Sequence, residues 1–110
     1  GFRVIGLKKV ALGQRQAEGF YAVHRERPFF GSLVEYMTSG PVYVAALERH
    51  NAVATLRQVM GATDPAKADA NTIRKEFGES IEQNAIHGSD SDDNAKGEIA
   101  FFFAGTEIVG

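Results

Sequence analysis

The 110-residue chain contains no cysteine and no tryptophan, and it has only three prolines. The absence of cysteine excludes a disulfide framework, a thiolate zinc site and a cysteine nucleophile, and it agrees with a reducing compartment. No apolar run approaches the roughly 20 residues that a membrane span needs, and no signal peptide opens the chain. We therefore expect a cytoplasmic protein that does not enter a membrane.

The chain also lacks an excess of either charge. Its 12 Lys and Arg residues and 14 Asp and Glu residues give a formal net charge of −2. Because nucleic-acid binding calls for a broad basic surface, we expect no specific nucleic-acid partner. An anion site has to be built locally, from a few arginines and backbone amides. The length suits one domain over residues 1–110.

Hydrophobic periodicity predicts a small α+β fold. The predicted strands are a strand over 2–12, curved or bulged near Gly6, and a buried strand over 42–47. The predicted helices cover 14–24, 28–40 with Gly40 as a left-handed cap, 51–60 with Asn51 as N-cap and Gly61 as stop, 65–70, 72–77, and a last helix that starts at Ser91 and stops at Gly105. A long loop over 78–91, with a short strand near Ile81, completes the chain. Two strands do not make a stable sheet alone, so either more sheet is missing or a partner supplies it.

The chemically most informative stretch is Asn84–Ser91, with the sequence NAIHGSDS. Here His87 precedes a glycine, small polar residues and the start of a helix. Helix N-termini carry unpaired N–H groups and a partial positive charge, so the stretch places an imidazole beside a potential phosphate site. Glu98, about two turns into the last helix, is either an orienting partner for the imidazole or a solvated surface residue. The other histidines, His24 and His50, are interpreted as ordinary exposed residues.

Cations and aromatic residues that suit a nucleotide occur elsewhere in the chain. Arg57 and Arg74 carry guanidinium groups that match phosphate oxygens, although each is also a reasonable surface arginine. Thr63, in the turn between them, is either a phosphate donor or a cap for the helix that starts at Pro65. Phe29 and Phe30 belong to the core, or one of them stacks on a base. No Walker loop or GxGxxG motif is present, so a nucleotide has to bind in a less common way.

Six segments together resemble the nucleoside diphosphate kinase family. They run in the family's order over nearly the whole chain: Glu18–Ala22 (EGFYA), Arg27–Phe30 (RPFF), Ser39–Val42 (SGPV), Met60–Pro65 (MGATDP), Thr72–Arg74 (TIR) and Asn84–Ser91 (NAIHGSDS). The resemblance implies a ferredoxin-like α/β sandwich with an antiparallel sheet. Family members begin with a strand and a helix before the position of Phe2, and we expect this unit to be absent from the chain. That strand lies in the middle of the family's four-stranded sheet and ends near a lysine that contacts phosphate.

The resemblance also implies a function and its residues. A nucleoside triphosphate such as ATP or GTP passes its terminal phosphate to His87, and the phosphohistidine passes it to a nucleoside diphosphate such as ADP. By resemblance, Glu98 and Ser89 hold the imidazole and Tyr21 lines the catalytic pocket. Arg57, Thr63 and Arg74 hold phosphates, Asn84 holds the sugar, and Phe29 stacks on the base with Leu33 nearby. Magnesium is expected on the nucleotide phosphates, with no metal site of the protein's own.

Further expectations concern pH, assembly and activity. Because His87 must be neutral to attack, activity should fall as acid protonates it. The family assembles as dimers that form tetramers or hexamers, so a homo-oligomer is expected. Two alternatives remain open. One is a non-catalytic nucleotide-binding or assembly fragment of the same family, which the absent lysine favours. The other is a histidine phosphocarrier for a different kinase, which needs only His87.

Overall fold

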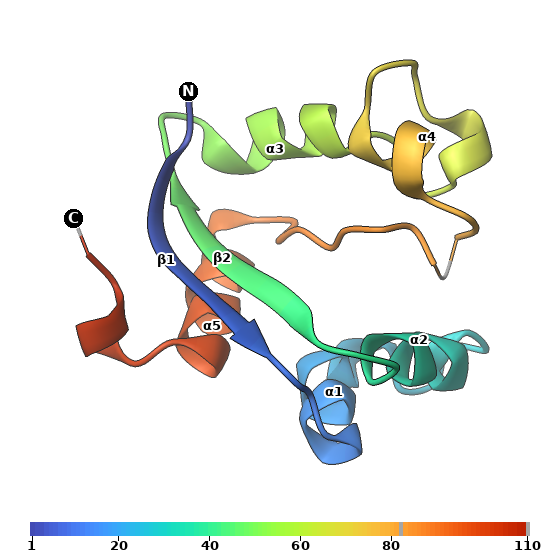
Figure 1. Cartoon of the computed structure of the whole chain (residues 1–110), viewed down its shortest axis with the longest axis horizontal. Coiled ribbons are helices and arrows are strands. Elements are labelled where there is room, and N and C mark those ends of the chain that lie inside the picture. Colours follow the sequence, from blue (N-terminus) through green and yellow to red (C-terminus); the bar gives the residue numbers. More distant parts are fainter. Residues whose placement is uncertain (82, 110) are drawn as a thin grey trace.

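The sheet consists of two antiparallel strands, β1 (Arg3–Val10) and β2 (Val42–Glu48). The computed structural model describes residues 1–81 and 83–109 (Figure 1). The pairing register shifts between Val4 and Gly6, which confirms the bulge predicted there. A Cβ at Gly6 would lie only 3.0 Å from Ile108 Cδ1 and 3.1 Å from Phe103 Cε1. Glycine at this position therefore lets the C-terminal segment pack directly on β1.

The prediction that β2 is buried is wrong. Of its residues only Ala46 is buried, and Tyr43 is 71% exposed. The reason is that a two-stranded sheet covered on one face buries alternate side chains. The exposed side chains Val4 and Leu7 of β1 are also apolar. The sheet therefore presents apolar surface to solvent.

Two helices follow each strand at opposite ends of the sheet (Figure 1). After β1 come α1 (Gln14–Phe20), the 3₁₀ turn η1 (Ala22–His24) and α2 (Phe30–Met37). The single helix predicted over 14–24 thus breaks at Tyr21. The predicted left-handed cap at Gly40 is wrong, because α2 already ends at Thr38. There the hydroxyls of Thr38 and Ser39 donate to the carbonyls of Val34 and Tyr36, at 2.9 and 2.6 Å.

After β2 come α3 (Ala52–Met60), the 3₁₀ turn η2 (Pro65–Lys67) and α4 (Ile73–Phe77). Asn51 occupies the N-cap position with a φ of 56°, but its side chain makes no capping hydrogen bond. Gly61, with a φ of 89°, ends α3 as predicted. The cap of η2 is Asp64, which accepts from the Ala66 N–H at 3.0 Å, so the alternative role of Thr63 as that cap is wrong.

The long loop ends at α5 (Asp92–Phe102), which is followed by the 3₁₀ turn η3 (Gly105–Glu107). Ser91 caps α5 by accepting from the Asn94 N–H at 3.1 Å, as its place at the predicted helix start suggested. Ile81 is exposed and lies in a bend, so the short strand predicted near it is not found at this residue. The next residue, Glu82, lies outside the described residues. In Figure 1 the loop runs between the α3–α4 pair and the α1–α2 pair.

The α+β class with an antiparallel sheet, predicted from the sequence, is confirmed. The core is small: among the described residues Met60 is the only large side chain that is fully buried. None of the described helices combines the length and the apolar character needed to cross a membrane.

Candidate functional site

His87 lies beside a carboxylate that the last helix supplies. The Nε2 atom of His87 is 3.1 Å from Glu98 Oε1, and the Ser89 hydroxyl donates to the same oxygen at 2.8 Å. Since a carboxylate only accepts hydrogen bonds, the Nε2 nitrogen carries the imidazole proton in this arrangement. Nδ1 is then the nitrogen with the free electron pair. The structure thus brings His87, Ser89 and Glu98 together.

Two aromatic rings form a wall against the imidazole. The rings of Phe20 and Tyr21 meet His87 edge to face, with centroids 5.3 and 5.4 Å away. Tyr21 is only 3% exposed. Burial, reinforced by the negative charge of Glu98, raises the pKa of Tyr21 far above its ordinary value, so this phenol stays neutral. The wall fixes the ring of His87 from the side of α1.

The backbone around His87 is held by close packing against α3. A Cβ at Gly88 would lie 2.6 Å from Met60 Sδ and 3.3 Å from Leu56 Cδ2. Glycine at this position therefore lets the loop lie directly on the buried Met60. Two residues before His87, Ala85 has a φ of 74°, a left-handed conformation that costs a non-glycine residue about 1 kcal/mol or more.

Arg74 lies behind this loop and ties it to α3. Its Nη2 donates to the Ile86 carbonyl at 2.9 Å and its Nη1 donates to the Gly61 carbonyl at 3.3 Å. The residue is 6% exposed, and its Nε is buried without a hydrogen-bond partner among the described residues. Burial, with a smaller contribution from Arg57, lowers the pKa of Arg74. Arg74, which the sequence predicts to bind phosphate, therefore uses both terminal nitrogens to hold backbone carbonyls, one of them next to His87.

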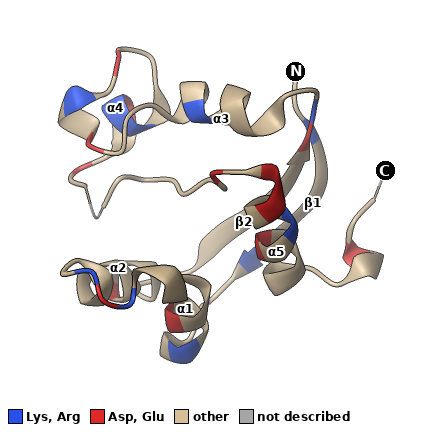
Figure 2. Cartoon of the chain, turned by 180° about the vertical axis from the view of Figure 1, so that it is seen from behind, with Lys and Arg blue, Asp and Glu red and all other residues tan. Residues whose placement is uncertain are grey.

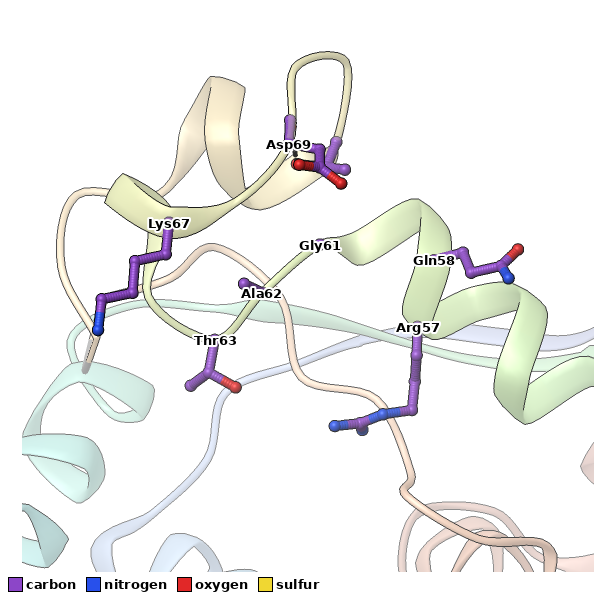
Figure 3. Close-up of a pocket in the computed structure, with 8 residues that line it drawn as sticks. Arg57, Gln58, Gly61, Ala62, Thr63, Lys67 and Asp69 are labelled. Carbon is purple, nitrogen blue, oxygen red and sulfur yellow. Dashed lines mark hydrogen bonds between the residues drawn. The ribbon is translucent and has the colours of Figure 1, made fainter.

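A cavity of about 340 Å³ lies at the end of α3. The residues that line it come from α3, η2 and the turns beside them: Arg57, Gln58, Gly61, Ala62, Thr63, Lys67, Asp69 and Thr72. Figure 3 shows the side chains of Arg57, Thr63 and Lys67 projecting to the same side of this segment, with Thr63 between the other two. Two cationic groups and a hydroxyl on one side suit an anion.

Charged side chains lie on both sides of the segment that carries His87. Figure 2 shows Lys and Arg on α3 and α4, and Asp and Glu at the start of α5. Asp90 accepts a hydrogen bond from Asn94 at 2.6 Å, which, more than the positive charge of Arg57, lowers the pKa of this carboxyl group. The segment from α3 to residue 79 carries four acidic residues beside its four Lys and Arg residues, so this side of the molecule is mixed in charge.

The residues predicted to hold the sugar and base lie on different elements. The Asn84 side chain donates to the Thr63 carbonyl at 3.4 Å, which places it next to the cavity. Phe29 and Leu33 are half-buried at the start of α2, and the Phe29 ring lies 5.6 Å from the ring of His24. His24, interpreted from the sequence as exposed, is half-buried by this contact.

The donor set of the cavity does not resemble a magnesium cage. No group of three or more His, Cys, Asp or Glu side chains in residues 1–81 and 83–109 is arranged to hold a metal ion. Among the described residues, Asp69 is the one carboxylate that lines the cavity, beside cationic and neutral groups.

Three features of the site were not predicted from the sequence. Phe20 was assigned only to the apolar side of a helix, and Met60 only to the face of another. The sequence gives no indication of a role for Lys67, because a lysine in a short polar turn carries no local signal of a site. The adjacent aromatic residues Phe20 and Tyr21 are the one signal in the sequence that could have indicated the wall beside His87. Two consecutive residues of a regular helix point in different directions, so both rings reach His87 only because the helix bends there.

Comparisons with known proteins place the chain among its relatives. The family model described as nucleoside diphosphate kinase matches residues 1–108. The chain is 64% identical to the nucleoside diphosphate kinase of Granulibacter bethesdensis over 99% of this chain and 78% of that protein. It is also 64% identical to the nucleoside diphosphate kinase of Rhizorhabdus wittichii, over all of this chain and 79% of that protein.

Two solved structures share the fold. The nucleoside diphosphate kinase of Aquifex aeolicus superposes with a TM-score of 0.95 at 47% identity, covering 99% of this chain and 79% of that chain. A halophilic nucleoside diphosphate kinase from Halobacterium salinarum, in complex with CDP, superposes with a TM-score of 0.94 at 40% identity, covering 100% and 74%. From the match over residues 1–108 and these relatives, the chain belongs to the nucleoside diphosphate kinase family.

Proposed function

We propose that this chain is a nucleoside diphosphate kinase that carries phosphate on His87. The observation that carries the proposal is the contact between His87 Nε2 and Glu98 Oε1 at 3.1 Å. This contact keeps a proton on Nε2 and leaves the electron pair of Nδ1 free to attack phosphorus. Ser89, on the same carboxylate oxygen, fixes the position of Glu98.

In the first half-reaction, Nδ1 of neutral His87 attacks the terminal phosphorus of a nucleoside triphosphate. The bond between that phosphorus and the bridging oxygen breaks, and the nucleoside diphosphate leaves with the electron pair. The imidazole ring becomes positively charged, and Glu98 stabilises this charge through Nε2–H. Such a transfer depends mainly on alignment and charge neutralisation, which rigid walls such as Phe20 and Tyr21 favour.

In the second half-reaction, a terminal oxygen of a different nucleoside diphosphate attacks the phosphohistidine. The phosphorus–nitrogen bond breaks, and its electron pair returns to Nδ1. Arg57 and Thr63 are the residues that would contact the phosphates, because both line the cavity. Arg74 would add its charge from behind while it holds the Ile86 carbonyl. Magnesium enters as part of the nucleotide substrate, where it neutralises phosphate charge.

The base and the sugar would bind at the outer end of the site. Phe29 offers a half-exposed ring for stacking, with Leu33 one helical turn away, and Asn84 offers an amide group near Thr63. Stacking without hydrogen bonds to the base edges tolerates every base, so we expect low base selectivity. The complex of the Halobacterium salinarum relative with CDP supports a pyrimidine as one possible base.

The test is phosphate transfer to the chain itself. After incubation with γ-³²P-ATP and magnesium, we expect label on the protein that is lost in acid and retained in alkali, as phosphohistidine requires. His87→Ala should abolish this label, whereas His50→Ala, a substitution in the turn before α3, should leave it unchanged. Label that survives His87→Ala would overturn the proposal. Nucleotide binding without any label would instead favour a non-catalytic nucleotide-binding member of the family.

We also propose that the chain forms a homo-oligomer. Val4, Leu7 and Tyr43 leave more than half of their surface exposed on the two-stranded sheet. Apolar surface gathered on one element is typical of a surface that a further protein segment covers.

A further inference from the structure

We propose that Lys67 is an additional phosphate-binding residue, one that holds the distal phosphates of a nucleotide next to Thr63. The inference rests on the proposed function in one respect, namely that the nucleotide phosphates occupy the cavity at the end of α3. It goes beyond that function because it adds a cation that neither the motifs nor the family resemblance assigned.

The backbone of Lys67 is held firmly. Lys67 is the last residue of η2, whose N-cap Asp64 accepts from the Ala66 N–H at 3.0 Å. The Lys67 N–H itself donates to the Asp64 carbonyl at 3.0 Å, and the neighbours Pro65 and Ala68 are buried. A short turn anchored on both sides fixes the position from which the lysine side chain starts.

The ammonium group of Lys67 is available for a ligand. Lys67 is exposed and lines the cavity, and it forms no hydrogen bond or ion pair with any side chain in the described part of the chain. Asp69, the one carboxylate of the cavity lining, is not paired with it (Figure 3). The same figure shows Lys67 and Arg57 on either side of Thr63. The Thr63 hydroxyl is turned toward Arg57 in this view, so a row of phosphates that passes Thr63 would meet Arg57 at one end and Lys67 at the other.

Lys67 contributes a second positive charge to the cavity, whereas the guanidinium group of Arg74 is already hydrogen-bonded to the backbone. The terminal nitrogens of Arg74 donate to the Gly61 and Ile86 carbonyls, and the residue is almost fully buried. Arg57 and Lys67 are then the cationic side chains that line the cavity. A diphosphate or triphosphate carries several negative charges in a row, so two cations with a hydroxyl between them suit it better than one.

The test compares ligands that differ only in their phosphates. Calorimetry with adenosine, AMP and ADP, at fixed magnesium and low salt, gives the dissociation constants for the chain and its variants. For Lys67→Met, which keeps the length of the side chain and removes its charge, we expect ADP to bind about 3- to 10-fold more weakly. AMP should change by less than about 2-fold. The affinity for adenosine should not change.

Two further variants test whether the effect on ADP binding comes from the charge of Lys67 or from the total charge of the protein. Lys75→Met removes an exposed lysine of α4 that does not line the cavity, and it should leave ADP binding unchanged. Lys67→Arg, which keeps the charge, should restore ADP affinity. Equal losses in the Lys67→Met and Lys75→Met variants would overturn the inference, as would an unmodified chain that binds ADP no more tightly than adenosine.

The inference and the proposed function fail separately. Acid-labile label on His87 together with unchanged ADP binding in Lys67→Met would leave the kinase proposal in place and overturn the role of Lys67. ADP binding that depends on Lys67, in a chain that never acquires label, would uphold the role of Lys67 and overturn the kinase proposal.

Discussion

One carboxylate oxygen orients the residue at the centre of the site. Glu98 Oε1 accepts from both His87 Nε2 and the Ser89 hydroxyl, so a single side chain determines which imidazole nitrogen is protonated. The neighbouring rings of Phe20 and Tyr21 restrict the imidazole to one plane. Contacts from α1, from α5 and from the loop before α5 therefore together determine the direction of the Nδ1 electron pair.

Changing Glu98 to glutamine tests this orientation. Glu98→Gln keeps the size of the side chain but replaces the carboxylate with an amide, so the imidazolium formed during transfer loses its counter-charge. We expect phosphate transfer to slow by about 10- to 100-fold. ADP affinity should stay unchanged, because Glu98 does not line the phosphate cavity. Single-turnover labelling and calorimetry measure the two quantities, and a matching loss in both would contradict the orienting role.

The left-handed conformation of Ala85 makes a prediction about stability. Ala85 has a φ of 74°, which glycine adopts without the steric cost that alanine pays. We expect Ala85→Gly to raise the free energy of unfolding by about 0.5–1 kcal/mol, measured by urea denaturation. Ala104→Gly is the matched control, because Ala104 has a φ of −73° and glycine there should lower stability slightly. A lower stability in Ala85→Gly would show that the conformation carries no strain.

Among the elements, the C-terminal turn η3 is attached to β1 by charge. Lys8 Nζ lies 3.2 Å from both carboxylate oxygens of Glu107, and Glu107 Oε1 also accepts from the Ala104 N–H at 2.7 Å. The hydrogen bond from Ala104, followed by the contact with Lys8, lowers the pKa of Glu107 below its ordinary value. The next segment is bound to β1 as well, since the Val109 N–H donates to the Ile5 carbonyl at 2.8 Å.

This attachment should weaken in acid. A carboxylate with a lowered pKa in the folded chain stabilises the fold at neutral pH, and this contribution disappears as the pH falls through the folded pKa. We therefore expect the amide of Val109 to lose protection from hydrogen exchange as the pH drops below the ordinary glutamate range. Glu107→Gln should show weak protection at neutral pH already. Protection of Val109 that is independent of pH in the unmodified chain would contradict this prediction.

The elements differ in how far the sequence predicts them. The strands, α2, α3 and α5 follow from apolar periodicity and from local caps such as Ser91 and Gly61, because those signals involve neighbouring residues only. The break at Tyr21 and the end of α2 at Thr38 depend on side-chain hydroxyls and on packing against His87. The cap of η2 depends on the residue at which the turn begins, which places Asp64 and not Thr63 at the N-cap position. Such contacts are not encoded in hydrophobic spacing.

The site shows the same division. The motif Asn84–Ser91 and the cations Arg57 and Arg74 could be singled out from the sequence, since residue type and spacing carried the signal. The contact of Gly88 with Met60 and the use of Arg74 to hold the Ile86 carbonyl could not, because each joins segments more than ten residues apart. The sequence therefore predicts which groups do chemistry better than it predicts which groups hold them.

For the whole molecule, the small core and exposed sheet favour self-association. One large side chain is fully buried among the described residues, whereas Val4, Leu7 and Tyr43 are exposed on the sheet. We expect sedimentation equilibrium to give a mass that is a multiple of the chain mass, and added salt should not dissociate an assembly held by apolar contacts. A single species with the mass of one chain at all concentrations would contradict the proposed homo-oligomer.

The segment that carries His87 joins two halves of the molecule. Its backbone is attached to the α3–α4 side through Arg74, Met60 and the bond from Asn84 to Thr63. The imidazole itself touches α1 and α5. A change in the structure on either side would therefore reach His87, through its backbone or through its ring. We expect the imidazole resonances of His87, followed by NMR, to report changes on both sides of the site, whether or not a nucleotide is present.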